Sequence, residues 1–154
     1  MIRMSKEADY GVILLAHLAG RDELVRQSSR QLAEETKLTL PMVSKVLKIL
    51  ARQGLLASYR GVKGGYSLAR PADAISVVEI IQAVEGPIAM TECIESPGEC
   101  CHEPLCRLQS NWRTINDVVT RALSEIKLSD MIEPLDDQSI AFLKLENGSS
   151  KHAF

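Results

Sequence analysis

The sequence predicts a mainly α-helical fold, made of a winged helix-turn-helix domain and a long C-terminal dimerisation helix. The apolar residues are mostly Leu, Ile, Val and Ala, and aromatic residues make up only 4% of the chain, which suits helices better than a β-sandwich. Two short helical patterns precede a glycine-rich hairpin, and a regular apolar stripe follows later. With 154 residues, 45% of them hydrophobic, the chain can bury one ordinary core but not two enzymes.

Three helices are expected before the hairpin. The first covers residues 5–19, and the second follows a serine N-cap at residues 28–35. The third can be capped by Thr39 and ends at Gly54. Its buried stripe consists of Val43, Val46, Leu47 and Leu50.

The second and third helices match the helix-turn-helix pattern, in which the second helix of the pair enters the major groove of DNA. Two strands, at 55–60 and 66–70, follow and are joined by the glycine-rich tip 61–65. Its glycines permit positive φ and close backbone approach, and Arg60 and Lys63 place positive charge there. We interpret this hairpin as a DNA-binding wing, the alternative being a surface hairpin with solvated cations.

Charge is divided unevenly along the chain. Residues 1–70 carry 12 Lys and Arg against 6 Asp and Glu, whereas residues 71–154 carry 6 against 14. The first part therefore suits contact with a polyanion and the second does not. The residues expected to contact double-stranded DNA are Ser29, Pro41, Met42, Ser44, Lys45, Lys48, Arg52, Arg60 and Lys63.

All four cysteines lie within fourteen residues. In a reducing cytosol such crowding favours metal binding or redox chemistry over structural disulfides. Cys93, Cys100 and Cys106 are spaced so that a folded loop can present them to one metal centre, in a spacing typical of neither zinc ribbons nor bacterial ferredoxins. Because successive side chains diverge, Cys100 and Cys101 are not expected to serve one small cluster together.

A fourth helix is expected from the capping box at 76–79 to Gly86. From about residue 105, apolar residues recur at alternating steps of four and three. They are Leu108, Trp112, Ile115, Val119, Ala122 and Ile126. The simplest partner for this seam is a second copy, giving a homodimer that reads a pseudo-palindromic operator, and the alternative is intramolecular docking.

The expected organisation is thus a DNA-binding domain at 1–86, a cysteine-rich loop at 87–106, a dimerisation helix at 107–132 and a flexible tail at 133–154. The N-terminus lacks the order of a signal peptide, and the apolar run 11–19 is too short to span a bilayer. We expect a cytoplasmic protein without a membrane partner.

Together these stretches resemble the IscR/NsrR-type winged-helix iron-sulfur regulators of the Rrf2 family, most closely the branch that regulates SUF cluster-assembly operons. The resemblance covers about residues 1–132 and rests on the stretches 4–11, 40–48, 60–70, 90–93 and 110–119 together with Cys106. It implies an iron-sulfur cluster, 2Fe-2S favoured and 4Fe-4S possible, bound by Cys93, Cys100 and Cys106, with Cys101 as an extra thiol.

Three positions are considered for the fourth cluster ligand: Gln109, Asp9 and His102. In the IscR branch a histidine stands three residues after the last cysteine, where this chain has Gln109. In the nitric-oxide-sensing branch an aspartate of the first helix is donated by the other subunit, and Asp9 occupies that place. We prefer Asp9 over His102, although an aspartate there is also typical of a helix N-terminus.

The function expected from residues and resemblance together is cluster-dependent DNA binding by a non-enzymatic regulator, with repression of SUF-type genes as the resemblance implies. One alternative is a zinc or thiol sensor using Cys93, Cys100 or Cys101, Cys106 and His102. Another is an iron-sulfur carrier. The glutamates in or beside the loop predict a low reduction potential for a bound cluster; they are Glu92, Glu95, Glu99 and Glu103.

Overall fold

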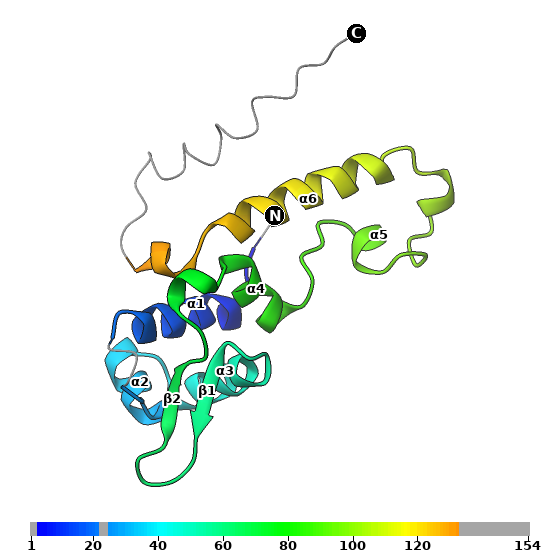
Figure 1. Ribbon diagram of the computed structural model, residues 1–154. Helices are drawn as coiled ribbons and strands as arrows, with labels where there is room; N and C mark the ends of the chain where they lie inside the picture. Colours follow the sequence, from blue (N-terminus) through cyan, green and yellow to red (C-terminus); the bar gives the residue numbers. More distant parts are fainter. Residues whose placement is uncertain (1–2, 22–24, 133–154) are drawn as a thin grey trace.

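Helices α1 to α4 form the body of the domain in the computed structural model, which describes residues 3–21 and 25–132 (Figure 1). Their bounds are Lys6–Ala19 for α1, Ser29–Thr36 for α2, Leu40–Arg52 for α3 and Val77–Glu85 for α4. A short 3-10 turn, η1, precedes α4 at Ala72–Ala74. The predicted mainly helical fold is confirmed.

The helix starts follow local capping signals. Ser28 and Ser76 each form a full capping box, in which the serine side chain and the residue three positions later satisfy each other's backbone amides. Thr39 occupies the predicted N-cap position of α3, although its side chain makes no hydrogen bond there. Gly54 adopts a φ of 74° directly after α3, a conformation that favours glycine.

One hydrophobic core lies between these helices. The predicted stripe of α3, from Val43 to Leu50, is fully buried. It meets Leu14 and Leu15 of α1, Leu32 of α2 and Ile80 of α4, all of which have no exposed surface. Since α1 packs against α2, α3 and α4, more than one of its faces is buried.

The wing is an antiparallel hairpin of β1, Leu56–Tyr59, and β2, Gly65–Leu68. Gly61 has the predicted positive φ, 98°, and Gly65 has a φ of 150°. Gly64 is not in the left-handed region; it is required because a Cβ there would collide with the carbonyl oxygen of Tyr59. The wing is therefore confirmed, with strands slightly shorter than expected.

Beyond α4 the chain leaves the body and returns along α6, Gln109–Glu125 (Figure 1). The cysteine loop between them contains the single-turn α5, Glu92–Glu95, and the 3-10 turn η2, Glu103–Leu105. After α6 the backbone pairs with residues 75–77 and enters η3, Leu128–Met131, which packs against α1.

Helix α6 therefore occupies the middle of the predicted range 107–132, and Ile126 lies just beyond its end. The predicted tail at 133–154 lies outside the described residues. Within the described part of the chain, no helix is long and apolar enough to cross a membrane.

Candidate functional site

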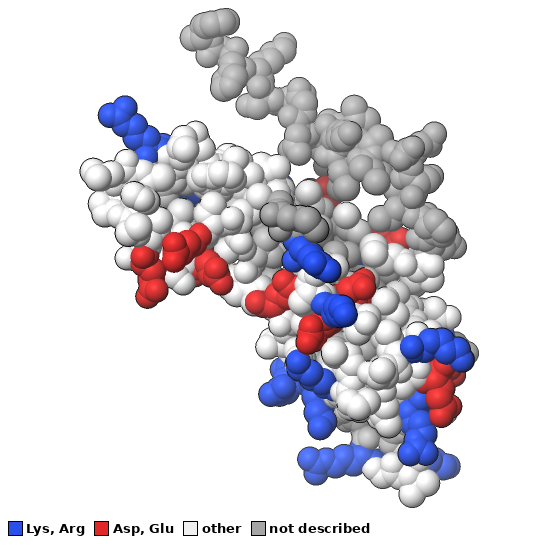
Figure 2. Space-filling view, turned by 180° about the vertical axis from the view of Figure 1, so that it is seen from behind, with Lys and Arg blue, Asp and Glu red and all other residues white. Residues whose placement is uncertain are grey.

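A basic groove runs between the exposed side of α3 and the wing. Lys48 and Arg52 project from successive turns of α3, and Ser58 and Tyr66 line the opposite side. Lys and Arg gather at the end of the molecule that carries the wing (Figure 2). Acidic residues gather on the arm that the cysteine loop and the start of α6 form (Figures 1 and 2). The end that carries the wing therefore presents positive charge to a polyanion.

At the start of α3 the predicted contact residues differ in exposure. Pro41 and Lys45 are exposed, whereas Ser44 is half-buried. Met42, expected to face outward, is half-buried and packs against the core. A long, flexible methionine side chain can fill gaps at the edge of a core. Ser29 is the first residue of α2 and is also half-buried.

Lys45 is held by an acidic neighbour. Its Nζ lies 3.1 Å from Oε1 of Glu7 on α1. A backbone hydrogen bond and the Lys45 ammonium lower the pKa of Glu7, so this carboxylate stays ionised at neutral pH. Lys45 thus reaches the surface as part of an ion pair, and its charge toward a ligand is partly neutralised.

The tip of the wing carries exposed Arg60 and Lys63. Between them Val62 is completely exposed. Next to the tip, where β1 ends, the guanidinium of Arg26 lies 3.6 Å from the centroid of the Tyr59 ring, a cation–π contact. The wing therefore exposes two cations at its tip, and Arg26 contacts the strand that leads into that tip.

The four thiols differ in accessibility. Cys93 lies in α5 and is buried, with its Sγ 3.3 Å from the hydroxyl of Thr91. Cys100 and Cys106 are half-buried, and Cys101 is exposed. All four are free of disulfides.

Glu103 organises the loop between these cysteines. Its carboxylate accepts hydrogen bonds from the amide of Gly98 and from Nε2 of Gln109, both at 2.6 Å. Its backbone joins the flanking cysteines, because its amide donates to Cys100 and its carbonyl accepts from Cys106. Gln109 stands where the IscR branch has a histidine, and its side-chain amide is used in this hydrogen bond to Glu103.

The thiols fit an iron-sulfur centre by their chemistry. Soft thiolates suit such clusters, and the three are free on one short segment. In the described residues no three His, Cys, Asp or Glu side chains are grouped closely enough to hold a metal ion, so a shared centre requires the loop to rearrange. His102 is exposed, and Asp9 lies on α1 in a shallow hollow with Arg3 and Glu85.

Asn116 was not singled out from the sequence, yet it attaches the first part of the cysteine loop, before Cys93, to α6. It is 7% exposed, its Oδ1 accepts from the amide of Met90 at 3.1 Å, and its Nδ2 donates to the carbonyl of Ile88 at 3.0 Å. A signal was present, since Asn116 stands four residues after Trp112, in phase with the apolar stripe.

The apolar stripe of α6 divides into two parts. Toward the C-terminal end of α6, Val119 of the stripe is half-buried and lines a groove formed with α4 and the segment 86–90. Leu123, which lies outside the predicted stripe, lines the same groove. Further toward the helix start, Leu108, Trp112 and Ile115 are 56%, 36% and 42% exposed. Intramolecular packing therefore covers part of Val119, whereas the N-terminal part of the stripe and Ala122 stay exposed in a single chain.

Comparison with known proteins identifies this combination of wing, arm and helix. The sequence profile of the Rrf2 family, described as an iron-dependent transcriptional regulator, matches residues 4–134. The chain belongs to the Rrf2 family. The HTH-type transcriptional regulator IscR of Escherichia coli (strain K12 / DH10B) is 28% identical to this Rrf2 chain over 131 residues, 85% of this chain and 80% of IscR.

Solved structures agree with the Rrf2 assignment. CymR (YrzC), the global cysteine regulator of B. subtilis, gives a TM-score of 0.69 at 27% identity, covering 88% of this chain and 100% of CymR. T. potens IscR gives a TM-score of 0.63 at 27% identity, covering 85% of this chain and 86% of that one. This Rrf2 protein is a DNA-binding transcriptional regulator and not an enzyme.

Proposed function

We propose that this Rrf2 protein is a cytoplasmic, homodimeric regulator whose affinity for its operator depends on an iron-sulfur cluster in the cysteine loop. Its target genes, by the resemblance to the SUF branch, encode cluster-assembly proteins that it represses. The observation that carries the proposal is the attachment of the cysteine loop to α6 through Asn116. Any reordering of the loop then acts directly on the helix that bears the uncovered apolar stripe.

The division of labour follows the chain. Residues 1–86 bind DNA, 87–106 bind the cluster and 107–132 form the dimer, while the tail at 133–154 takes no part in this proposal. Leu108, Trp112 and Ile115 supply the dimer contact, because their exposed area loses water only when a second copy covers it.

At the DNA, the two parts of the basic surface take different roles. Pro41, Met42, Ser44 and Lys45 meet base edges or adjacent phosphates of the major groove, and Ser29 lies at the start of the preceding helix. The basic groove beside the wing contacts the phosphate backbone through Lys48 and Arg52, and the tip reaches the minor groove with Arg60 and Lys63. A dimer presents two such surfaces to a pseudo-palindromic operator.

Cys93, Cys100 and Cys106 would hold the cluster, with 2Fe-2S favoured over 4Fe-4S, and Asp9 of a second copy would complete the set. When bound, the cluster supplies metal–thiolate bonds that replace the hydrogen bonds of the free loop. A hard carboxylate among thiolates binds iron more weakly, which suits a sensor that must release its cluster.

A second candidate is regulation by the thiols themselves or by zinc. It is favoured by the exposure of Cys101, which leaves this thiol accessible to oxidants. In a zinc site, Cys101 could take the place of Cys100, and His102 would be the fourth ligand in place of Asp9. The remaining alternative is an iron-sulfur carrier, for which the cluster-bound and cluster-free proteins need not differ in DNA affinity.

Absorption and electron paramagnetic resonance spectra of the anaerobically purified protein separate these candidates. We expect iron-sulfur features that are lost in Cys93→Ala and Cys106→Ala and retained in the matched control Cys101→Ala. DNA affinity is then measured by fluorescence anisotropy, on a duplex that the wild-type protein selects from a random-sequence pool. Equal affinity of the cluster-bound and cluster-free proteins for this duplex would contradict the proposed function.

A further inference from the structure

Besides the packing of β1 on α3 and of β2 on α1, two consecutive residues attach the wing to the segment before α2. The amide of Gln27 donates to the carbonyl of Tyr66 at 3.0 Å, and the amide of Tyr66 donates back at 2.8 Å. Arg26 stacks on Tyr59 of the other strand. A Cβ on Gly65 would lie 2.7 Å from the carbonyl oxygen of Gln27, so the approach leaves no space for a side chain.

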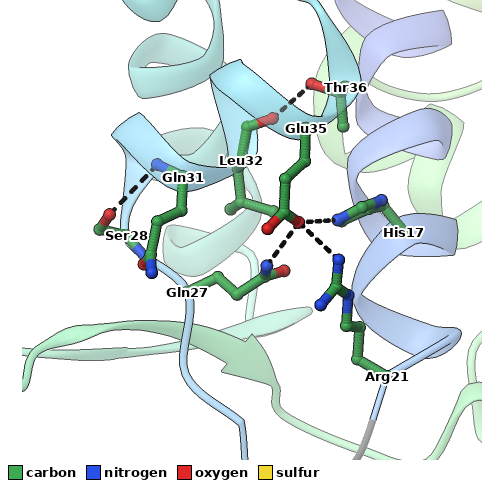
Figure 3. Close-up of polar contacts among 8 residues, drawn as sticks. All are labelled: His17, Arg21, Gln27, Ser28, Gln31, Leu32, Glu35 and Thr36. Atoms are coloured by element: carbon green, nitrogen blue, oxygen red, sulfur yellow. Dashed lines mark hydrogen bonds and ion pairs between the residues drawn. The ribbon is translucent and has the colours of Figure 1, made fainter.

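The side chain of Gln27 continues this attachment to α2 (Figure 3). One carboxylate oxygen of Glu35 accepts hydrogen bonds from Gln27 Nε2 at 2.7 Å, Arg21 Nη2 at 2.8 Å and His17 Nε2 at 2.6 Å. Arg21 and His17 come from the end of α1 and the turn after it. Glu35 therefore joins the wing, through Gln27, to two helices of the body.

Helix α2 does not need this carboxylate to stay in place. Leu32 and Ala33 pack it into the core, with 0% and 8% of their surfaces exposed. Glu35 itself is exposed, and exposed ion pairs contribute little to overall stability. Its distinctive contact is with Gln27, which is 3% exposed and whose backbone pairs with Tyr66 of the wing.

We propose that Glu35 is a positioning residue for DNA binding, which acts through Gln27 to fix the wing relative to α3 and so sets where Arg60 and Lys63 meet the duplex. This inference rests on the proposed contact of the wing with DNA. Glu35 itself touches no phosphate; its charge alone would repel DNA.

Whether a Glu→Gln substitution in α2 weakens or tightens DNA binding distinguishes a positioning role from a simple change of charge. Glu34→Gln is a matched control, because Glu34 is the adjacent exposed residue of α2 and makes no hydrogen bond or ion pair among the described residues. Removing a negative charge should leave DNA binding unchanged or slightly tighter in Glu34→Gln. In Glu35→Gln the loss of wing position should outweigh this gain and weaken binding about fivefold, as expected for the net contribution of one hydrogen bond at an exposed site.

A double-mutant cycle between Glu35 and Lys63 tests whether Glu35 affects DNA binding through the wing tip. Dissociation constants are measured by anisotropy for the full chain on the duplex selected by the wild-type protein, in wild type, Glu35→Gln, Lys63→Ala and the double variant. If Glu35 acts through the wing, Glu35→Gln weakens binding less in the Lys63→Ala background than in the wild type. Additive losses, or equal effects of Glu35→Gln and Glu34→Gln, overturn the inference while leaving the proposed function intact.

Hydrogen exchange adds a readout that does not depend on DNA. The amides of Gln27 and Tyr66 should exchange faster in Glu35→Gln, with the core amides of α3 unchanged. Should Glu35→Gln fail to fold, Gln27→Met keeps the backbone bridge, removes the bond to Glu35, and should reproduce the weaker binding. If neither Arg60→Ala nor Lys63→Ala weakens DNA binding, the proposed wing contact fails and this inference with it.

Discussion

Asn116 holds Met90 by a 3.1 Å hydrogen bond that crosses from α6 to the segment leading into α5. The same carboxamide donates to Ile88, so both of its polar atoms are used. The entry of the cysteine loop is thereby fixed to α6 before the first thiol, Cys93, is reached.

Replacing Asn116 with alanine should loosen this junction. The half-buried amide of Met90 and carbonyl of Ile88 lose their partner, at a cost of about 1 kcal/mol in unfolding free energy. Urea denaturation measures the loss, and the reaction of Cys93 with a thiol reagent should become faster. Asn111→Ala, at an exposed position of the same helix, is the control and should change neither quantity.

Asp9→Ala should leave cluster binding possible but make the cluster more labile in air. The reason is that a weakly held iron loses its oxygen ligand altogether. The decay of visible absorbance after exposure to oxygen measures this, with the exposed Asp73→Ala as control. An unchanged decay rate would refute the assignment of Asp9.

Glu79 predicts an acid dependence of stability. The hydrogen bond from the backbone of Ser76 and the guanidinium of Arg70, 2.7 Å away, lower the pKa of Glu79 from 4.5 to about 2. Because the folded pKa is depressed, the stabilisation is present above the ordinary pKa and is lost as pH falls from about 4.5 toward 2. Unfolding free energies measured across this range should fall less steeply in Glu79→Gln than in the wild type.

Glu7→Gln should tighten DNA binding. The substitution frees Lys45 from its ion pair and removes a negative charge beside the start of α3. We expect a gain of roughly threefold at low salt, which shrinks as salt screens the charges. In a Lys45→Ala background the gain should be mostly lost; a full gain there would mean that Lys45 does not contact DNA.

Ile115→Asp should convert the proposed dimer to a monomer. A charge in the centre of the uncovered stripe cannot be buried against a second copy without a large desolvation cost. Sedimentation velocity measures the change. Val62→Asp places the same charge on an equally apolar, fully exposed residue away from α6, and should leave the oligomeric state as in wild type.

Local signals made much of the fold predictable. The serines at 28 and 76 start their helices as expected, and the buried stripe of α3 follows from its apolar period. Thr39 shows where such reasoning ends, because the residue type suited the cap and the side chain still makes no capping bond. Its position was predictable and its hydrogen bonding was not.

The contacts that organise the candidate site join distant segments and could not be predicted. Gln27 pairs with Tyr66, and Glu35 collects donors from two other segments, although nothing in their spacing marks them as a group. The assignments of DNA contacts and cluster ligands stay predictions, since they concern partners that bind the protein from outside.

The return of the chain after α6 gives this helix a second attachment. The carbonyl of Ile126 accepts from the amide of Val77, the first residue of α4, and the amide of Leu128 donates to the carbonyl of Ile75. Together with the hydrogen bonds of Asn116, these contacts hold α6 at its middle and at its end. In the proposed dimer, a rotation of the two α6 helices against each other would therefore carry both wings with it.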